Sequence, residues 1–120
     1  MADFHTYLQY AENLIGGATK GIFAKIDQMT FKMVIEGLKR DDVQAVSIII
    51  DQLVRERRPV SIPPLFVVAE KHPQEKIRVK AAEALHQLDP EGEVKRLTDG
   101  KTIEESVKIL VEHYGNYKSL

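Results

Sequence analysis

The sequence contains no cysteine and no tryptophan, and only seven glycines and five prolines among its 120 residues. The absence of cysteine excludes a disulfide framework, a thiolate metal site and a thiol nucleophile, and it fits a reducing compartment. The scarcity of glycine and proline, together with 43% hydrophobic residues, is typical of a folded domain rather than a disordered chain. At this length we expect residues 1–120 to form a single helical domain with one core.

An excess of charge of either sign is also lacking. Acidic and basic residues are interspersed and nearly balanced, which gives a formal net charge of -1 at pH 7. The chain therefore has no overall field that would draw it to nucleic acid or to an anionic membrane surface. We do not expect either among its partners.

Long hydrophobic runs are missing as well. The longest, such as Ala45–Ile50, are far shorter than the roughly 20 apolar residues needed to cross a bilayer. Residues 1–10 lack the basic region and uninterrupted apolar segment of a signal peptide. These features predict a cytoplasmic protein.

Apolar residues recur at helical spacing along almost the whole chain, which predicts an all-α fold. Residues 22–27 are expected to form a short helix or an irregular segment. The other helices are expected at residues 4–15, 31–38, 43–54, 62–71, 75–88, a short stretch through 94–97, and 103–114.

Four helix boundaries depend on particular residues. The glycines at 16–17 are expected to end the first helix, and Thr30 is expected to cap the second. Asp89 followed by Pro90 is expected to open the short helix before residue 99. The sequence TIEE, residues 102–105, has the pattern of a capping box.

The most apolar of these segments is 43–54, whose hydrophobic positions extend almost around the helix axis. A helix of this kind is expected in the middle of a fold. Its isoleucine run, 48–50, is also compatible with a buried strand, because periodicity does not separate the two over a short run. A polar row at spacings of three and four favours the helix; it consists of Gln44, Ser47, Asp51 and Arg55.

The segment 75–88, EKIRVKAAEALHQL, separates an apolar face from a polar one. The apolar face contains Ile77, Ala81, Ala84, Leu85 and Leu88, and the polar row contains Lys76, Lys80, Glu83 and Gln87. This segment resembles the second helix of a HEAT-like repeat of the phycobilisome-lyase type, whose pattern is an aliphatic residue, Arg, Ala-Ala, Ala-Leu and Leu. Its flanks, SIPPLFVVAEKHP and LDPEGEVKRL, resemble the neighbouring helices of such an array.

A weaker copy lies 34 residues upstream, with Val43 in the place of Ile77 and Val54 in the place of Leu88. The resemblance covers residues 30–114, with one good repeat and two degenerate ones, and it leaves Arg78 without an obvious partner. It implies a short right-handed stack of antiparallel helix pairs, that is, a HEAT-like α-solenoid or α-α superhelix. Residues 1–28 would then be an N-terminal capping helix with a Gly-rich turn, and 115–120 a tail.

In this family the second helix of each pair lines the concave side of a rigid surface, so the resemblance implies a non-enzymatic interaction module or adaptor that binds another protein. Tyr7 and Tyr10, off the main stripe of the first helix, are further candidates because large aromatic residues anchor interfaces, although they could equally pack on the Gly-rich turn. A homodimer is also open. The residues expected to contact the partner are Gln44, Ser47, Asp51, Arg55, Lys76, Lys80, Glu83 and Gln87.

Two other functions remain open at this point. If the resemblance extends to activity, the chain is a small accessory protein of the phycobilin-lyase type, handling a tetrapyrrole or a phycobiliprotein. Alternatively, a basic edge could bind nucleic acid weakly, although Glu56 interrupts it and no aromatic residue is interleaved for base stacking. That edge would consist of Lys39, Arg40, Arg55, Arg57 and Arg58.

No catalytic motif is present in the sequence. The four histidines form no metal-binding pair or cluster with glutamate. The GGATKG segment lacks the Lys and Ser/Thr that a phosphate loop places after its second glycine. We therefore expect no enzymatic activity, no cofactor and no metal, with His72 at a helix end and His5, His86 and His113 on exposed faces.

Overall fold

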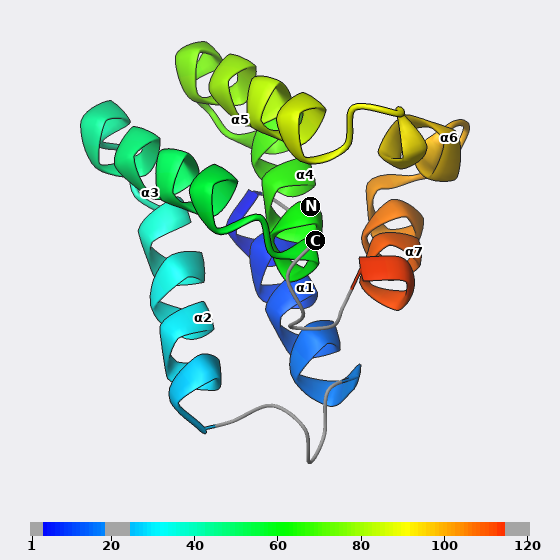
Figure 1. Ribbon diagram of the computed structural model, residues 1–120, viewed down its shortest axis with the longest axis horizontal. Helices are drawn as coiled ribbons and strands as arrows, with labels where there is room; N and C mark the ends of the chain where they lie inside the picture. The colour runs from blue at the N-terminus through cyan, green and yellow to red at the C-terminus, as the bar shows by residue number, and fades with distance from the viewer. Residues whose placement is uncertain (1–3, 19–24, 115–120) are drawn as a thin grey trace.

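The computed structural model describes residues 4–18 and 25–114, with side chains for 4–15 and 31–114. Within these ranges the chain is helical and contains no strand (Figure 1), which confirms the all-α prediction and removes the strand alternative at 48–50. No helix of the described ranges has both the length and the apolar character needed to span a bilayer. The elements are α1 (Phe4–Ala18), α2 (Lys25–Leu38), α3 (Val43–Glu56), a 3-10 turn (Pro59–Ser61), α4 (Ile62–Lys71), α5 (Glu75–Leu88), α6 (Glu93–Thr98) and α7 (Ile103–Tyr114).

The helices form two layers. In the upper layer of Figure 1, α3 and α5 lie side by side and run in the same direction. In the lower layer, α1 packs on α2, α4 and α7, while α4 also packs on α5 and α7. The short α6 packs on α7. The α3–α5 layer therefore carries both polar rows that the sequence singled out.

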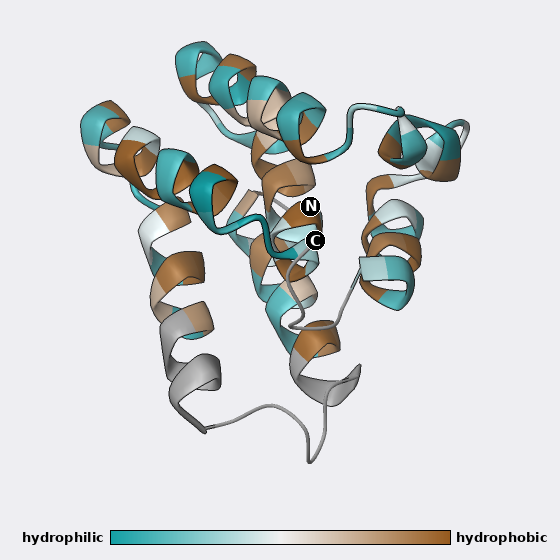
Figure 2. Ribbon diagram, in the orientation of Figure 1, coloured by the Kyte–Doolittle hydropathy of each residue, from teal (hydrophilic) through white to brown (hydrophobic). Residues whose placement is uncertain are grey.

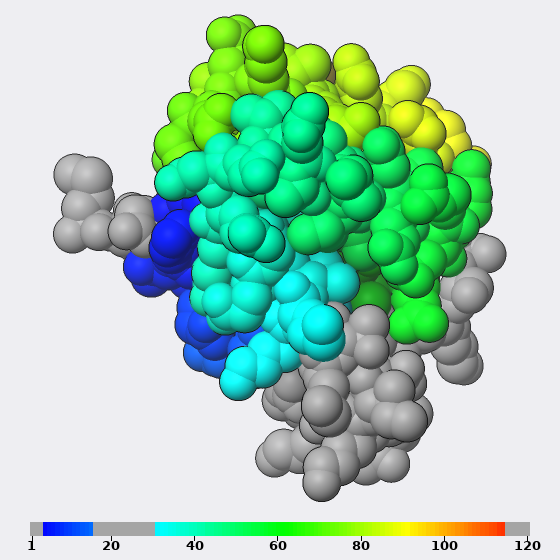
Figure 3. Space-filling model, turned by 90° about the vertical axis from the view of Figure 1, so that its left-hand side faces the viewer, coloured from blue at the N-terminus to red at the C-terminus, as the bar shows by residue number. Residues whose placement is uncertain are grey.

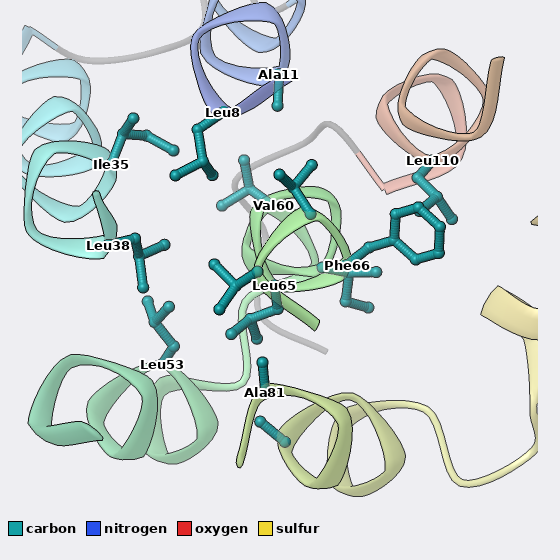
Figure 4. Close-up of a cluster of buried hydrophobic side chains, with 14 of the residues drawn as sticks. Leu8, Ala11, Ile35, Leu38, Leu53, Val60, Leu65, Phe66, Ala81 and Leu110 are labelled. Carbon is teal, nitrogen blue, oxygen red and sulfur yellow. The ribbon is translucent and has the colours of Figure 1, made fainter. Parts of the chain in front are cut away.

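The centre of the fold is α4. Every residue from 59 to 68 is buried, and Leu65 and Val67 have no exposed surface. Figure 4 shows Leu65 and Phe66 among side chains that come from α1, α2, α3, α5 and α7. A helix with neighbours on every side needs no polar face, which explains its unbroken apolar sequence.

The prediction that segment 43–54 lies in the middle is wrong. Only Val46, Ile50 and Leu53 of α3 are buried, and Ile48 is 64% exposed. Figure 2 shows hydrophilic and hydrophobic residues alternating along α3. The physical reason is that α3 packs with one face on the core, while no described element covers its opposite face.

Capping groups fix the starts of α3 and α7. The Asp42 carboxylate accepts hydrogen bonds from the backbone N–H groups of Gln44 and Ala45, at 3.0 and 3.2 Å. The capping box is confirmed: Thr102 Oγ1 accepts from the Glu105 N–H at 3.1 Å, and the Glu105 carboxylate accepts from the Thr102 N–H at 3.0 Å. These hydrogen bonds with Thr102 lower the pKa of Glu105.

Two predicted boundaries near the N-terminus are wrong. α1 continues through the glycines at 16–17 to Ala18, because glycine weakens a helix by only about 1 kcal/mol and does not forbid it. α2 already begins at Lys25, so Thr30 lies inside the helix rather than at its cap. The expected division between residues 28 and 30 therefore falls within α2, and much of the expected Gly-rich turn lies outside the described residues.

The start of α6 is displaced as well. The Asp89 carboxylate does accept from the backbone N–H groups of Glu93 and Val94, at 3.0 and 2.8 Å. The helix nevertheless begins at Glu93 and not at Pro90, because a turn that ends at Gly92 precedes it. Gly92 has a φ of 76°, a conformation that other residues adopt only with strain.

The turn between α2 and α3 is bound by side chains from two other parts of the chain. Three successive backbone carbonyls of this turn each meet a side chain from outside it. We call this the turn junction: Nε2 of His5 with the carbonyl of Lys39 at 3.2 Å, Nε2 of His72 with the carbonyl of Arg40 at 3.2 Å, and the amide of Gln74 with the carbonyl of Asp41. The junction holds the starts of α3 and α5 beside each other.

Tyr114, the last residue of α7, gives the fold a sensitivity to alkaline pH. Its side chain is 9% exposed, and burial, with the nearby carboxylates of Asp89 and Glu93, raises the pKa of Tyr114 to about 12. An unfolded tyrosine titrates near pH ~10, so between these values the unfolded chain releases a proton that the native chain retains.

We therefore expect the free energy of unfolding to fall by about 2 kcal/mol as pH rises through this window, and Tyr114→Phe to remove that contribution. Urea unfolding of both proteins at about pH 8 and about pH 11.5 isolates this contribution, because all other groups titrate in both proteins. An equal pH dependence in the two proteins would contradict the expectation.

Candidate interaction surface

The two polar rows predicted from the sequence meet on one surface. Nζ of Lys80 on α5 lies 2.9 Å from Oδ1 of Asp51 on α3. Because α3 and α5 run side by side in the same direction, this contact places the two rows opposite each other. We define the α3–α5 face by these residues: Gln44, Ser47, Asp51, Arg55, Lys76, Lys80, Glu83 and Gln87.

The α3–α5 face is open to solvent. Ser47 and Lys80 are half-buried and the other six residues are exposed. An exposed ion pair such as Lys80–Asp51 contributes only about 0–1 kcal/mol to stability. Residues of this kind can be changed with little effect on folding, so the rows are available for recognition.

α5 packs on α4 through alanines and is also bound to it by an arginine. Ala81 and Ala84 are buried together with Ile77 and Leu88, and their small side chains let the two helices approach closely. Arg78, for which the sequence offered no partner, donates from Nη1 to the carbonyl of His72 at 2.6 Å, at the C-terminal end of α4. A cation is favourable there because the helix dipole is negative at that end.

An apolar spot lies beside the charged rows on α5. Val79 is 50% exposed, and a shallow hollow of about 540 Å³ is lined by Val79, Ala82, Glu83, His86 and Gln87. An aliphatic side chain within a polar rim is a common composition of protein-binding surfaces. Sequence periodicity placed Val79 off the buried stripe but did not mark it as part of a site.

The two candidate tyrosines lie elsewhere. Tyr7 and Tyr10 are half-buried on α1 and pack against the hydrophobic core. α1 packs on α2, α4 and α7, so these residues are not part of the α3–α5 face. The alternative that they pack on the Gly-rich turn concerns side chains outside the described residues.

The basic residues that suggested a nucleic-acid edge form two separate groups. Lys39 and Arg40 precede α3, whereas Arg55, Arg57 and Arg58 lie at its far end. A helix of 14 residues separates its ends by about 21 Å. Lys39 is also engaged, because its Nζ contacts Glu36 at 3.1 Å and donates to Gln9 at 3.1 Å. The structure does not bring these residues into one patch.

A second hollow, of about 460 Å³, lies between α4, α5, α6 and α7. Its walls include Phe66, Leu85 and Ile103, and Lys95 and Lys101 also line it. Sequence reasoning missed this hollow, because its residues come from four helices and no local spacing connects them. Ser106, 1% exposed, also lines it.

The histidines lie where the sequence placed them: His72 follows the last residue of α4, and His5, His86 and His113 are exposed. The burial of His72, at 1% exposure, was not predicted. No group of three or more His, Asp or Glu side chains in the described part of the chain is arranged to hold a metal ion.

The sequence was also compared with known proteins. It matched no protein-family model, and neither the curated proteins nor the solved structures gave a match.

Proposed function

We propose that this chain is a non-enzymatic interaction module that binds another protein through the α3–α5 face. The observation that carries the proposal is the Lys80–Asp51 contact, which joins polar rows from two separate helices into one surface. That surface mixes both signs of charge and borders the exposed Val79. Mixed charge gives a surface specificity for a complementary partner without attracting every charged molecule.

The proposal includes the finer architecture, in which α2–α3 and α4–α5 are two HEAT-like helix pairs of a short right-handed stack, α6–α7 is a third pair and α1 is the cap. In its support, α3 and α5 are both 14 residues long and begin at Val43 and Glu75, an offset of 32 residues. The turn junction also links the turn inside the first pair to the turn inside the second.

One contact limits how far such a stack extends. α1 packs on α7, so the first and last helices share one core, whereas repeats in an open array contact only their neighbours. The described chain is compact, with a radius of gyration of 13.0 Å. In this arrangement the outer side of α2–α3 is the edge on which another helix pair would stack.

The charge reversal Lys76→Glu with Glu83→Lys tests the proposal. Both residues are exposed and the net charge does not change, so folding should be unaffected while the charge pattern of the face is inverted. We expect the double variant, immobilised and exposed to a lysate of the source cell, to lose at least about tenfold of the partner that the wild type retains.

The matched control is Lys108→Glu with Glu112→Lys on α7, where both residues are exposed and the net charge is again conserved. This variant should retain the partner as the wild type does. Undiminished binding by the Lys76/Glu83 variant would refute the α3–α5 face as the binding surface. In that case Tyr7 and Tyr10 on α1 become the residues to change.

A further inference from the structure

The outer edge of the α2–α3 pair carries the most exposed of the large hydrophobic side chains described. Met33 on α2 is 72% exposed. Figure 3 looks onto this edge, with α2 and α3 side by side facing the viewer. A hollow of about 570 Å³ lies on it, and we define the α2–α3 edge by its lining residues Lys32, Met33, Glu36, Gly37, Arg40 and Ile49.

Met33 and Gly37 both line the hollow on this edge, and Met33 is the more exposed of the two. They are four residues apart, and therefore lie on the same row of α2, one turn and about 6 Å apart. A methyl group added at Gly37 would overlap Cδ1 of Ile49, so the missing side chain is what allows Ile49 to lie against the backbone of α2. The hollow is thus bounded by bare helix backbone and an aliphatic side chain.

We propose that a second copy of this chain covers the α2–α3 edge, with the two α2 helices antiparallel about a two-fold axis. A two-fold interface requires a patch that is complementary to itself. In this packing Met33 of each copy enters the hollow of the other, whose lining includes Gly37 and Ile49. The same symmetry brings Glu36, which pairs with Lys39 of its own copy, within a turn of Lys32 of the other copy, so opposite charges lie near each other at the rim.

The dimer goes beyond the proposed function, because it uses a different surface, but it rests on α2–α3 being the end pair of the stack. The two helices are each 14 residues long, so they present a face of about 21 Å by 20 Å. Such a face of about 420 Å² per copy is roughly half of the ~800 Å² per partner of a standard interface. The dimer is therefore weak, and its population rises with protein concentration.

Sedimentation equilibrium of the wild type and two variants tests the dimer. We expect the apparent mass of the wild type to rise with concentration toward twice the 13.6 kDa of one chain. Met33→Glu should weaken association by at least about tenfold, because the charge would be buried without a partner. Val79→Glu, at a similarly exposed position on α5, should associate as the wild type does.

A spin label locates the contact. The chain has no cysteine, so Arg40→Cys, at an exposed residue of the α2–α3 edge, and Lys108→Cys each supply a single labelling site. Dipolar spectroscopy should give a short distance between the two labels at position 40 and a long or undetectable one at position 108.

Three results would overturn the dimer: a wild type that stays monomeric at every concentration, association that survives Met33→Glu, or association that Val79→Glu abolishes. The last would place self-association near the α3–α5 face instead. A monomeric wild type that still captures its partner through Lys76 and Glu83 would refute the dimer and leave the proposed function intact.

Discussion

Leu65→Ala is expected to lower the free energy of unfolding by about 3–4 kcal/mol. Leu65 has no exposed surface and lies on α4, whose neighbours in Figure 4 come from both layers. Removing three carbon atoms there leaves a cavity that the surrounding helices cannot close without breaking their own contacts. Urea unfolding followed by far-ultraviolet circular dichroism measures the change, because the chain has no tryptophan for fluorescence.

Ile48→Ala is the matched control. It also removes three carbon atoms, but from a side chain that is 64% exposed on α3, so we expect a change within about 0.5 kcal/mol. Comparing the two losses of stability tests whether α4 or α3 is the central helix. A loss at Ile48 equal to that at Leu65 would mean that α3 is the buried helix, as the sequence alone suggested.

That error has an identifiable physical source. Segment 43–54 is rich in isoleucine and valine, but hydrophobic content alone does not measure burial. Its polar row, however, already showed that one side of the helix faces solvent, and Ile48 lies among those polar positions. In α4 the apolar run from residue 62 to 69 has no polar row at all. A continuous apolar circumference was the more informative signal.

The helices, and the caps of α3 and α7, were predictable because they depend on neighbours in sequence. Asp42 and the Thr102–Glu105 box make their hydrogen bonds within three residues, so local chemistry decides them. The glycine pair at 16–17 does not end α1, because its cost of about 1 kcal/mol per residue is small compared with the stabilisation from packing of the rest of the helix.

The spacing between the helix pairs was harder to predict from the sequence. Matching residue types within the sequence places the two repeat copies 34 residues apart, whereas the starts of α3 and α5 are 32 residues apart. The buried positions 46, 50 and 53 of α3 match 77, 81 and 84 of α5 at an offset of 31. Residue type is shared by buried and half-buried positions, so it does not fix which side of a helix faces the core.

The candidate surface was predictable in its parts but not in its assembly. Helical spacing alone identified the polar rows on α3 and α5. It could not show that Asp51 meets Lys80, because that contact depends on how α3 and α5 are placed along each other. The turn junction, whose hydrogen bonds join residues 32 to 34 positions apart, contributes to this placement together with the packing of α3 on α5.

The second large effect is expected at the turn junction, where His72→Ala should cost about 3 kcal/mol. The His72 ring is buried and its Nδ1 accepts from the backbone N–H of Gln74 at 3.0 Å. Nδ1 therefore carries no proton, so Nε2 is the protonated nitrogen that donates to the carbonyl of Arg40. Alanine would leave that carbonyl and the Gln74 N–H without their partners. It would also remove the edge-to-face contact with Phe4, in which the two ring centroids are 4.7 Å apart.

Two further variants divide that cost between the two hydrogen bonds. His72→Asn places an acceptor near the position of Nδ1 and can satisfy Gln74, whereas His72→Gln reaches toward Arg40 with a donor but leaves Gln74 unpaired. Each should therefore recover part of the stability lost by His72→Ala, measured by the same urea unfolding. If Asn were as stable as the wild type, the bond to Arg40 would contribute nothing to stability, and Gln74 alone would link the turn junction to the start of α5. If both variants were as unstable as alanine, ring packing against Phe4 would be the main contribution of His72, and its hydrogen bonds would follow from that packing.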